Sequence, residues 1–499
     1  MLVVISDLHL TDGSTGDSIS AGAFSIFVER LRDLALAASW RADGGYRPIE
    51  QIDVVLLGDV LDVIRSASWL DRPGSRPWSD PNSAEFVARV SQITGDILQH
   101  NESALEVLRG LSSRGGIAVP PALRVAKPAA ENEAEPVPVR VHYMVGNHDW
   151  FFHHPSPALR AVRELVVQKM GLANPGDKPF PHDMSESEEL LVAMRRHKVT
   201  ARHGDLYDPV NYEGDRDGSS LGDAIVVELV TRFGCEVQRE LGNDLPAGTL
   251  LGLREIDNVR PLLLVPVWID GLLERTCSWP ALRKQVKLIW DRLVDEFLAL
   301  DFVRQHDTYS PFDVVDGLQR VLKFSKRLPV NWASSITSWL NGLRGAGGDS
   351  YVAHALCEQD FRNRRSKHIV YGHTHNVEMV PLDASYAEGY VLNQVYFNSG
   401  TWRRMHRQTQ LAPAEHEFIA ADVMSYLAFF QGDERSGRPY ESWSGVLGYH
   451  PGEVTVHRID AGRASHAKGQ PLPAPSLHEH APHFASSMAK ARIVPRRRV

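Results

Sequence analysis

Apolar and polar residues follow two periods along the chain, one typical of strands and one typical of helices. An apolar run at 2–6 is followed by apolar residues at three- and four-residue spacing through 24–40, and then by a second apolar run at 52–60. These patterns predict a buried strand, an amphipathic helix and another buried strand. This order favours parallel strands, which carry their functional groups at the carboxyl ends.

The same two periods continue to residue 205. Helical spacing covers 83–112 and 157–170, whereas 126–139 is rich in Pro and Glu and predicts a loop. The segment "VHYMVGNHDW", 141–150, begins as a third buried strand and ends in three polar residues. We interpret 189–205 as two strands joined at "RRHK".

The second half of the chain changes from helical to strand-like patterns. From about 221 to 362 the spacing is helical, which predicts an inserted subdomain of four to six helices. Strand-like runs return at 367–375, 390–402 and 416–430. The sequence therefore predicts an α/β protein whose sheet domain is interrupted by helices.

We expect three regions along the chain. A sheet domain comprises 1–212 and 366–460, and 213–365 forms the helical insertion. The net charge of −8 divides into −14 for residues 1–460 and +6 for residues 461–499. The acidic body is a poor binder of polyanions. The basic tail is expected to be flexible, and its final Arg residues leave open a peripheral contact with an anionic membrane.

Composition is that of a soluble globular protein, with 43% hydrophobic and 23% charged residues. Cys235, Cys277 and Cys357 are odd in number and far apart, which predicts free thiols and a reducing, cytoplasmic location. The N-terminal segment lacks the features of a signal peptide, so we expect the protein to begin at Met1. The most apolar internal segment, 261–273, is too short and too interrupted to span a membrane.

Five short polar clusters stand where predicted strands end. Each follows an apolar run, and a single such cluster is more often a turn than a binding site. Their conjunction in one chain indicates a common site. The clusters are Asp7-Leu8-His9, Gly58-Asp59, Gly146-Asn147-His148-Asp149, His203-Gly204-Asp205 and Gly372-His373-Thr374-His375.

The residue types in these clusters indicate two divalent metal ions. Imidazole together with carboxylate suits Mn, Fe and Zn, whereas Mg and Ca prefer sites built almost wholly of oxygen. A shared carboxylate holds two ions about 3.5–4 Å apart, and such a pair binds a phosphoryl group and lowers the pKa of bound water. Metal-bound hydroxide is then the expected nucleophile, and Mn is the favoured metal.

The order D-x-H, G-D, G-N-H-D, H and G-H-x-H resembles that of the calcineurin-like metallophosphoesterase superfamily. The resemblance covers 1 to about 212 and 366 to about 405, and it leaves the insertion and the tail unexplained. It implies a four-layer αββα sandwich of two mixed sheets with the metals at the strand ends. It also implies in-line hydrolysis of a phosphomonoester, a phosphodiester or a nucleotide-linked pyrophosphate.

The resemblance further implies a role for each motif residue. His148 would be the catalytic histidine, which stabilises the phosphoryl oxygens or protonates the leaving group. Asp149 would orient His148. The implied metal ligands are Asp7, His9 and His375 for the first ion, the bridging Asp59, and Asn147, His203 and His373 for the second ion.

Other polar residues lie beside these motifs. We interpret Asp62 as a hydrogen-bond partner that fixes its loop, and we leave Asp205 and Asp208 open between ligand and structural roles. His153 and His154 are expected to be an exposed pair. The closing segment "FNSGTW" is expected to be structural.

Within the superfamily, the chain is similar to the UDP-2,3-diacylglucosamine pyrophosphatase-like branch. That branch carries Arg in place of His148, and the present insertion of about 140 residues is much larger, so lipid A synthesis is not assigned. The insertion is interpreted as a lid or wall over the metals or, almost equally, as a packing or oligomerisation module.

Three functions are compatible with these observations. A phosphoesterase acting on a small phosphoester is the first. A non-catalytic scaffold would show missing ligands, and none is missing from the motifs. A nuclease would need a basic groove with aromatic residues, which the acidic body argues against, so nucleic acid is an unexpected partner. The physiological substrate and the oligomeric state do not follow from the sequence.

Overall fold

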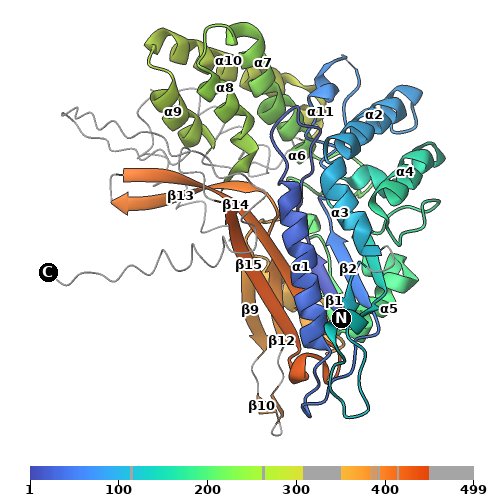
Figure 1. Ribbon diagram of the computed structural model, residues 1–499. Helices are drawn as coiled ribbons and strands as arrows, with labels where there is room; N and C mark the ends of the chain where they lie inside the picture. The colour runs from blue at the N-terminus through green and yellow to red at the C-terminus, as the bar shows by residue number, and fades with distance from the viewer. Residues whose placement is uncertain are drawn as a thin grey trace, which may run out of the picture.

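The structure is a computed structural model, and two mixed β-sheets form its centre (Figure 1). Residues 307–349 of the predicted helical insertion and the tail at 461–499 lie outside the described residues. The described residues are 1–72, 74–112, 116–260, 265–306, 350–383, 386–387, 390–391, 394–412 and 415–448.

The first sheet has the strand order β5-β2-β1-β14-β13-β7, and β15 also pairs with β14. Strands β1, β2 and β5 are parallel, whereas β14 runs antiparallel to β1, β13 and β15. The parallel strands confirm the β-α-β pattern near the N-terminus. The bounds are β1 Leu2–Ile5, β2 Ile52–Leu57, β5 Val139–Met144, β7 Val259–Arg260, β13 Arg404–Ala412, β14 Glu415–Phe429 and β15 Tyr440–Gly448.

The second sheet has the order β6-β8-β12-β9 and is also mixed. Strands β6, β8 and β12 are parallel, and the edge strand β9 is antiparallel to β12. Two small two-stranded ladders lie apart from both sheets. The bounds are β6 Val199–Ala201, β8 His368–Tyr371, β9 Val377–Asp383 and β12 Gln394–Ser399, with the small ladders β3 Ala118–Val119, β4 Glu135–Pro136, β10 Tyr386–Ala387 and β11 Tyr390–Val391.

Alternate residues of the central strands enter different apolar clusters. In β1, Val3 joins a cluster with the helices α1 to α4, whereas Val4 joins a cluster that contains residues of the second sheet. Phe397 of β12 belongs to the cluster shared by the two sheets. Tyr396 instead packs with Ala355 of α14 on the other face of the second sheet. The bounds are α1 Ala21–Ala38, α2 Ala84–His100, α3 Glu102–Ser112, α4 Arg160–Met170, α5 Glu188–Arg196, α14 Val352–Cys357 and α15 Gln359–Arg362.

The helical insertion has a core of its own. Its buried residues, from Leu221 to Val303, form one apolar cluster, and its helices group at one end of the molecule (Figure 1). The insertion also touches the first sheet, because β7 pairs in parallel with β13. The bounds are α6 Leu221–Ala224, a π-helix Ile225–Thr231, α7 Arg232–Leu241, α8 Ala247–Arg254, α9 Val265–Thr276, α10 Pro280–Ala299 and α11 Asp301–Gln305.

The prediction of two strands over 189–205 was wrong in its first half. Residues Glu188–Arg196 form α5, and only β6 follows as a strand. Ser187 caps this helix by accepting a hydrogen bond from Leu190 N, and acidic residues occupy its first turn and basic residues its last turn. The predicted helix over 83–112 is two helices, which meet at Asn101.

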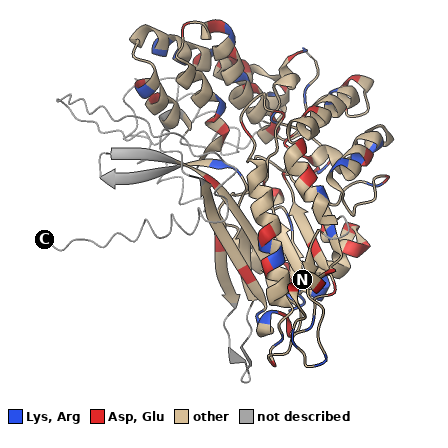
Figure 2. Cartoon of the chain, in the orientation of Figure 1, with Lys and Arg blue, Asp and Glu red and all other residues tan. Residues whose placement is uncertain are grey.

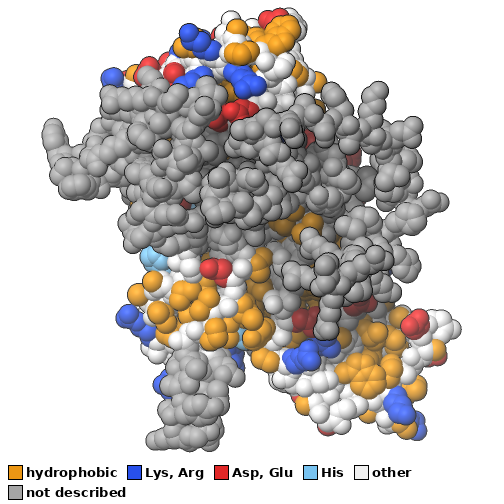
Figure 3. Space-filling model, turned by 90° about the vertical axis from the view of Figure 1, so that its left-hand side faces the viewer, with side chains coloured by type: hydrophobic (Ala, Val, Ile, Leu, Met, Phe, Trp, Pro, Cys, Tyr) orange, Lys and Arg blue, Asp and Glu red, His pale blue; other side chains and the backbone are white. Residues whose placement is uncertain are grey.

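The cysteines and the exposed apolar residues are distributed as follows. Cys235, Cys277 and Cys357 are free, as expected. In the part of the chain that the structure covers, no helix is both long enough and apolar enough to cross a bilayer. Figure 3 shows exposed hydrophobic side chains on one face of the molecule, and the exposed hydrophobic residues include Val377 and Met379 of the edge strand β9.

A buried carboxylate between β2 and β5 gives the fold a pH dependence. Asp53 is 1% exposed and accepts hydrogen bonds from Arg140 and Gln51, with His142 Nε2 at 3.2 Å. Burial alone would raise the pKa of Asp53, but the bonds from His142 and Arg140 outweigh burial and lower the pKa to about 2. Since this value lies below the ordinary value of 3.8, the stabilisation is complete above that pH and is lost as pH falls through 2.

We predict that Asp53→Asn lowers the free energy of unfolding by about 2 kcal/mol at pH 6, since one pKa unit corresponds to about 1.4 kcal/mol. About half of that difference should remain at pH 3. Urea unfolding of the wild type and of Asp53→Asn at pH 6 and pH 3 measures this difference in the free energy of unfolding. A difference that does not change with pH would contradict the assignment.

Candidate metal centre

The predicted metal ligands all follow the carboxyl ends of strands, and both sheets contribute them. Parallel strands in one sheet end at the same edge, which brings residues distant in sequence together. The first sheet supplies Asp7 and His9 after β1, Asp59 after β2 and Asn147 after β5, and the second sheet supplies His203 after β6 and His373 and His375 after β8.

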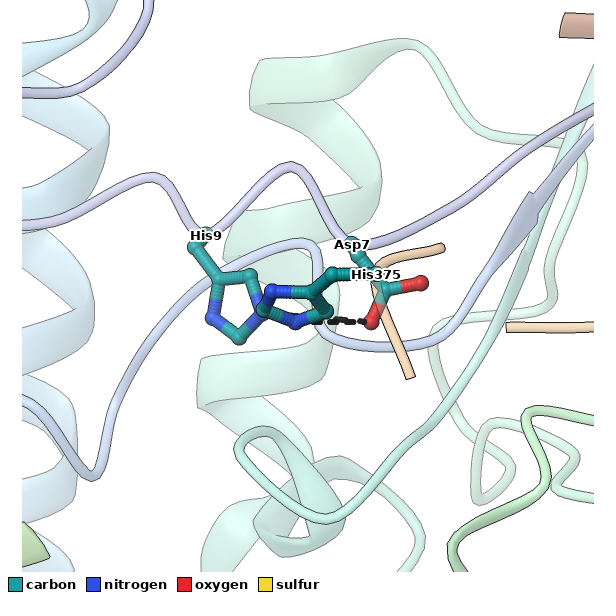
Figure 4. A group of neighbouring side chains, drawn as sticks. All are labelled: Asp7, His9 and His375. Atoms are coloured by element: carbon teal, nitrogen blue, oxygen red, sulfur yellow. Dashed lines mark hydrogen bonds and ion pairs between the residues drawn. The ribbon is translucent and has the colours of Figure 1, made fainter. Parts of the chain in front are cut away.

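Asp7, His9 and His375 form the first group. Their side chains point toward one another, and a dashed line marks the ion pair between His375 Nε2 and Asp7 Oδ1 at 3.3 Å (Figure 4). The Nε2 atoms of His9 and His375 are 3.0 Å apart, and His9 Nε2 lies 3.9 Å from Asp7 Oδ1. All three residues are buried, and the three ligand atoms are close enough to bind one ion.

Asp59, His203 and His373 form a second group, and Asn147 adjoins it. His203 Nε2 is 3.2 Å from Asp59 Oδ2, and His373 Nδ1 is 3.0 Å from the side-chain oxygen of Asn147. The three titratable residues also offer ligand atoms within reach of one ion. The sequence grouping of Asn147 with His373 and His203 therefore matches side chains that are adjacent in space.

Asp59 lies between the two groups. Its Oδ2 atom is 3.6 Å from His9 Nε2 and 3.2 Å from His203 Nε2, one imidazole from each group. Its other oxygen accepts a hydrogen bond of 2.8 Å from His148 N. A carboxylate in this position can bridge two ions.

In His203, His9 and His373, one ring nitrogen contacts a partner outside the ligand set, and the other ring nitrogen faces the predicted ligands. His203 Nδ1 lies 2.9 Å from the Leu57 carbonyl and donates to it, so Nε2 is the nitrogen that faces Asp59. This Nε2 atom is buried and has no hydrogen-bond partner among the described residues. His9 Nδ1 contacts Asp62, and His373 Nε2 contacts Asp208 at 3.1 Å. The donor set thus fits divalent metals.

Backbone conformation also distinguishes these residues. Ten described residues other than glycine have positive φ, and half of them are predicted ligands. Such conformations cost about 1–3 kcal/mol each and concentrate at functional sites. The five ligands are Asp7, His9, Asp59, His373 and His375, with φ between 45° and 66°.

Glycines allow the ligand loops to approach closely. A Cβ atom at Gly372 would lie 2.6 Å from Asp7 Oδ2, and one at Gly146 would lie 2.6 Å from His203 Cδ2. Real Cβ atoms do not approach this closely. These glycines of the G-N-H-D and G-H-x-H motifs are therefore required by packing around the ligands.

Burial and neighbouring charges shift the ionisation of the site. Burial, with a further contribution from Asp59, raises the pKa of Asp7 to about 6, although His203 opposes the shift. Burial, with Arg403, lowers the pKa of His9 to about 4. A neutral His9 at neutral pH is the form that can bind a metal.

Asp62, rather than Asp149, contacts the His148 side chain, so the predicted role of Asp149 is corrected. Asp62 Oδ1 lies 2.6 Å from His148 Nδ1, and its Oδ2 lies 2.8 Å from His9 Nδ1. Asp149 instead accepts hydrogen bonds from Gly146 N and Val60 N and from the Tyr143 hydroxyl, so its carboxylate holds the loop backbone. The spacing of residues in the sequence does not reveal the contact between Asp62 and His148, because the two residues follow different strands, β2 and β5.

His148 is the less buried member of this arrangement, with its side chain 12% exposed. Burial disfavours its charged form, but Asp62 and Asp59 outweigh burial and raise the pKa of His148 to about 10. It also lies close enough to His9 and Asp59 to offer a ligand atom to the same ion. Geometry alone therefore permits either a catalytic or a ligand role.

Asp205 and Asp208, which the sequence left open between ligand and structural roles, have different partners. Asp208 contacts His373 and is held by Asn211, whereas Asp205 pairs with Arg216. The expectation of an exposed histidine pair was wrong, because His153 is half-buried and His154 is buried. In "FNSGTW", the Asn398 side chain donates to the Gly372 carbonyl and the Thr401 hydroxyl donates to the Asp7 carbonyl.

Residues of the helical insertion contact side chains that adjoin the site. Trp150 Nε1, next to the G-N-H-D motif, donates to Asp223 at 3.2 Å. Arg403 Nη2 donates to Asp257 at 2.8 Å, and its Nη1 atom is buried without a partner in the described part of the chain. Sequence reasoning missed Arg403, since nothing in its neighbourhood marks it as part of a motif.

We predict that the Mn-loaded protein binds two ions per chain and that Asp59→Asn loses both, because Asp59 faces both groups. His375→Ala should lose the first ion. Asp96→Asn, which changes an exposed carboxylate on α2, is the control and should retain both ions. Elemental analysis after gel filtration measures the content. Full metal content in Asp59→Asn would contradict the bridging position.

Neither a protein-family model nor a curated protein sequence matches this chain.

Proposed function

We propose that this protein is a dinuclear metal-dependent phosphoesterase of the calcineurin-like metallophosphoesterase superfamily. The observation that carries the proposal is the convergence of seven oxygen and nitrogen ligands from five separate loops, with Asp59 between the two groups. Two buried carboxylates and four imidazoles in one place have no packing role that apolar residues would not serve better.

The proposed fold is the four-layer αββα sandwich of this superfamily. Support comes from three apolar clusters. One joins α1 to α4 to the first sheet, one joins the two sheets, and one covers the second sheet with residues of α14. This order of clusters is what four successive layers require.

Two divalent ions bound by these ligands would neutralise the charge of a phosphoryl group and lower the pKa of a water molecule at the site. Asp7, His9 and His375 would hold one ion, Asn147, His203 and His373 the other, and Asp59 both. Asp62 and Asp208 fix the rings of His9 and His373 from outside the ligand set.

His148 is proposed to act on the substrate. Asp62 engages its Nδ1 atom, so the opposite nitrogen of a protonated ring can donate to a phosphoryl oxygen or to the leaving group. Its side chain is partly exposed, whereas the side chains of His9 and Asp62 are almost completely buried. A substrate can therefore reach His148 more easily than it can reach these neighbours.

The proposed substrate is a small phosphoester rather than nucleic acid. Acidic and basic residues are mixed over the described surface elements (Figure 2). The net charge of −14 over residues 1–460 opposes long polyanions. The three free cysteines favour a reducing compartment such as the cytoplasm.

The test compares hydrolysis of p-nitrophenyl phosphate and bis(p-nitrophenyl) phosphate by the Mn-loaded protein and by His148→Ala. We predict that His148→Ala lowers kcat by about 10²–10⁴, the usual contribution of general acid–base catalysis. Its metal content should stay at two ions per chain. Asp96→Asn should keep wild-type turnover.

The metal measurement separates the two roles that the geometry permits for His148. Lost turnover together with a lost ion would make His148 a ligand rather than a catalytic residue. Undiminished turnover in His148→Ala would exclude both roles. Absence of hydrolysis of either ester by the wild type carrying two ions would count against the phosphoesterase proposal itself.

A further inference from the structure

A second cluster of metal-binding side chains lies outside the dinuclear centre. It consists of His153, His182 and Glu186, and it shares no residue with the groups that contain Asp7 or Asp59. His153 follows the 3₁₀ turn Trp150–Phe152, and Glu186 ends the 3₁₀ turn Met184–Glu186. Two imidazoles and a carboxylate form the set that binds zinc in many proteins.

The separations between donor atoms match those of a zinc site. His153 Nε2 and His182 Nδ1 are 3.2 Å apart, His153 Nε2 and Glu186 Oε2 are 3.5 Å apart, and His182 Nδ1 and Glu186 Oε1 are 2.9 Å apart. Tetrahedral zinc with bonds of about 2.0–2.1 Å separates its ligand atoms by about 3.3–3.4 Å. One ion can therefore contact all three residues after small side-chain adjustments.

The remaining nitrogen of His153 has the partner that a zinc ligand usually has. His153 Nδ1 lies 2.6 Å from Asp217 Oδ1. A carboxylate behind the imidazole fixes the tautomer, so that Nε2 presents its lone pair to the three-residue cluster. Asp217 lies between the 3₁₀ turn Asp205–Tyr207 and α6, the first helix of the insertion.

The cluster is also accessible and held in shape. The side chains of His153, His182 and Glu186 are 17%, 27% and 35% exposed, so an ion can enter and water can fill a fourth position. The backbone N–H of His182 donates to Glu186 at 3.0 Å, which ties the two ligands of this loop together. Pro181, the preceding residue, accepts a hydrogen bond from Val145 N.

We propose that His153 Nε2, His182 Nδ1 and the Glu186 carboxylate bind one zinc ion, with Asp217 as a positioning residue. This site is a third metal site, separate from the proposed dinuclear centre, and it does not depend on phosphoesterase activity. The ion joins the segment after the G-N-H-D motif to the loop at 181–186. Through Asp217 it also joins both to the start of the helical insertion.

The experiment uses the full chain with the dinuclear centre disabled by Asp59→Asn and His203→Ala. The protein is stripped with a chelator, equilibrated with zinc and analysed for bound zinc. We expect one zinc ion per chain, reduced to none when His182→Ala or Glu186→Gln is added. Asp217→Asn should weaken zinc binding by roughly 10–100-fold, the usual effect of losing such a partner.

A matched control is His306→Ala, which removes a histidine that pairs with the carboxylate of Glu213 at 3.1 Å. This variant should retain the zinc ion. Far-UV circular dichroism establishes folding of every variant, and if the disabled background does not fold, the wild type should bind one zinc ion more than His182→Ala. Absence of zinc from the folded background, or its retention by folded His182→Ala, would overturn the proposal. Both outcomes are independent of hydrolysis by the wild type.

Discussion

The burial of carboxylates is the constraint on which this structure depends. Asp7, Asp59 and Asp62 are almost completely buried and close to the same imidazoles. Burying negative charge is unfavourable unless positive charge or hydrogen bonds compensate. Neighbouring imidazoles outweigh burial and lower the pKa of Asp59 and Asp62. Burial, with a further contribution from Asp59, instead raises the pKa of Asp7 to about 6. In the proposed function, divalent cations would add further positive charge beside these carboxylates.

The loops around this charge are tied to each other through their backbones. Asp7 N donates to the Gly58 carbonyl and His9 N donates to the Asp59 carbonyl, while Trp402 N donates to the Asp7 carbonyl. These bonds hold residues with unfavourable positive φ in place. The positions of these side chains are therefore set by backbone contacts between the strand-end loops.

The sequence predicted well which side chains come together, because residues at the ends of buried parallel strands must meet at one edge. The sequence did not predict the contact between the side chains of Asp62 and His148, which follow two different strands. Asp62 was predicted only to fix its loop, and Asp149 was predicted to orient His148. In the structure Asp62 contacts the His148 ring, and Asp149 binds the loop backbone. Residues Glu188–Arg196 were misread because their apolar residues form one unbroken run at 190–194, and such a short run does not distinguish a strand from a helix. The cluster of His153, His182 and Glu186 could not be predicted, since neither His182 nor Glu186 lies in a motif.

The position of β1 has a consequence for synthesis. This strand pairs on one side with β2 and on the other with β14, whose residues come more than 400 positions later in the chain. While the ribosome is still producing the insertion, one edge of β1 has no partner and His375 does not yet exist. The group of Asp7, His9 and His375 therefore becomes complete only after nearly the whole chain has been translated, and any ion that it holds in the proposed function would bind after that point.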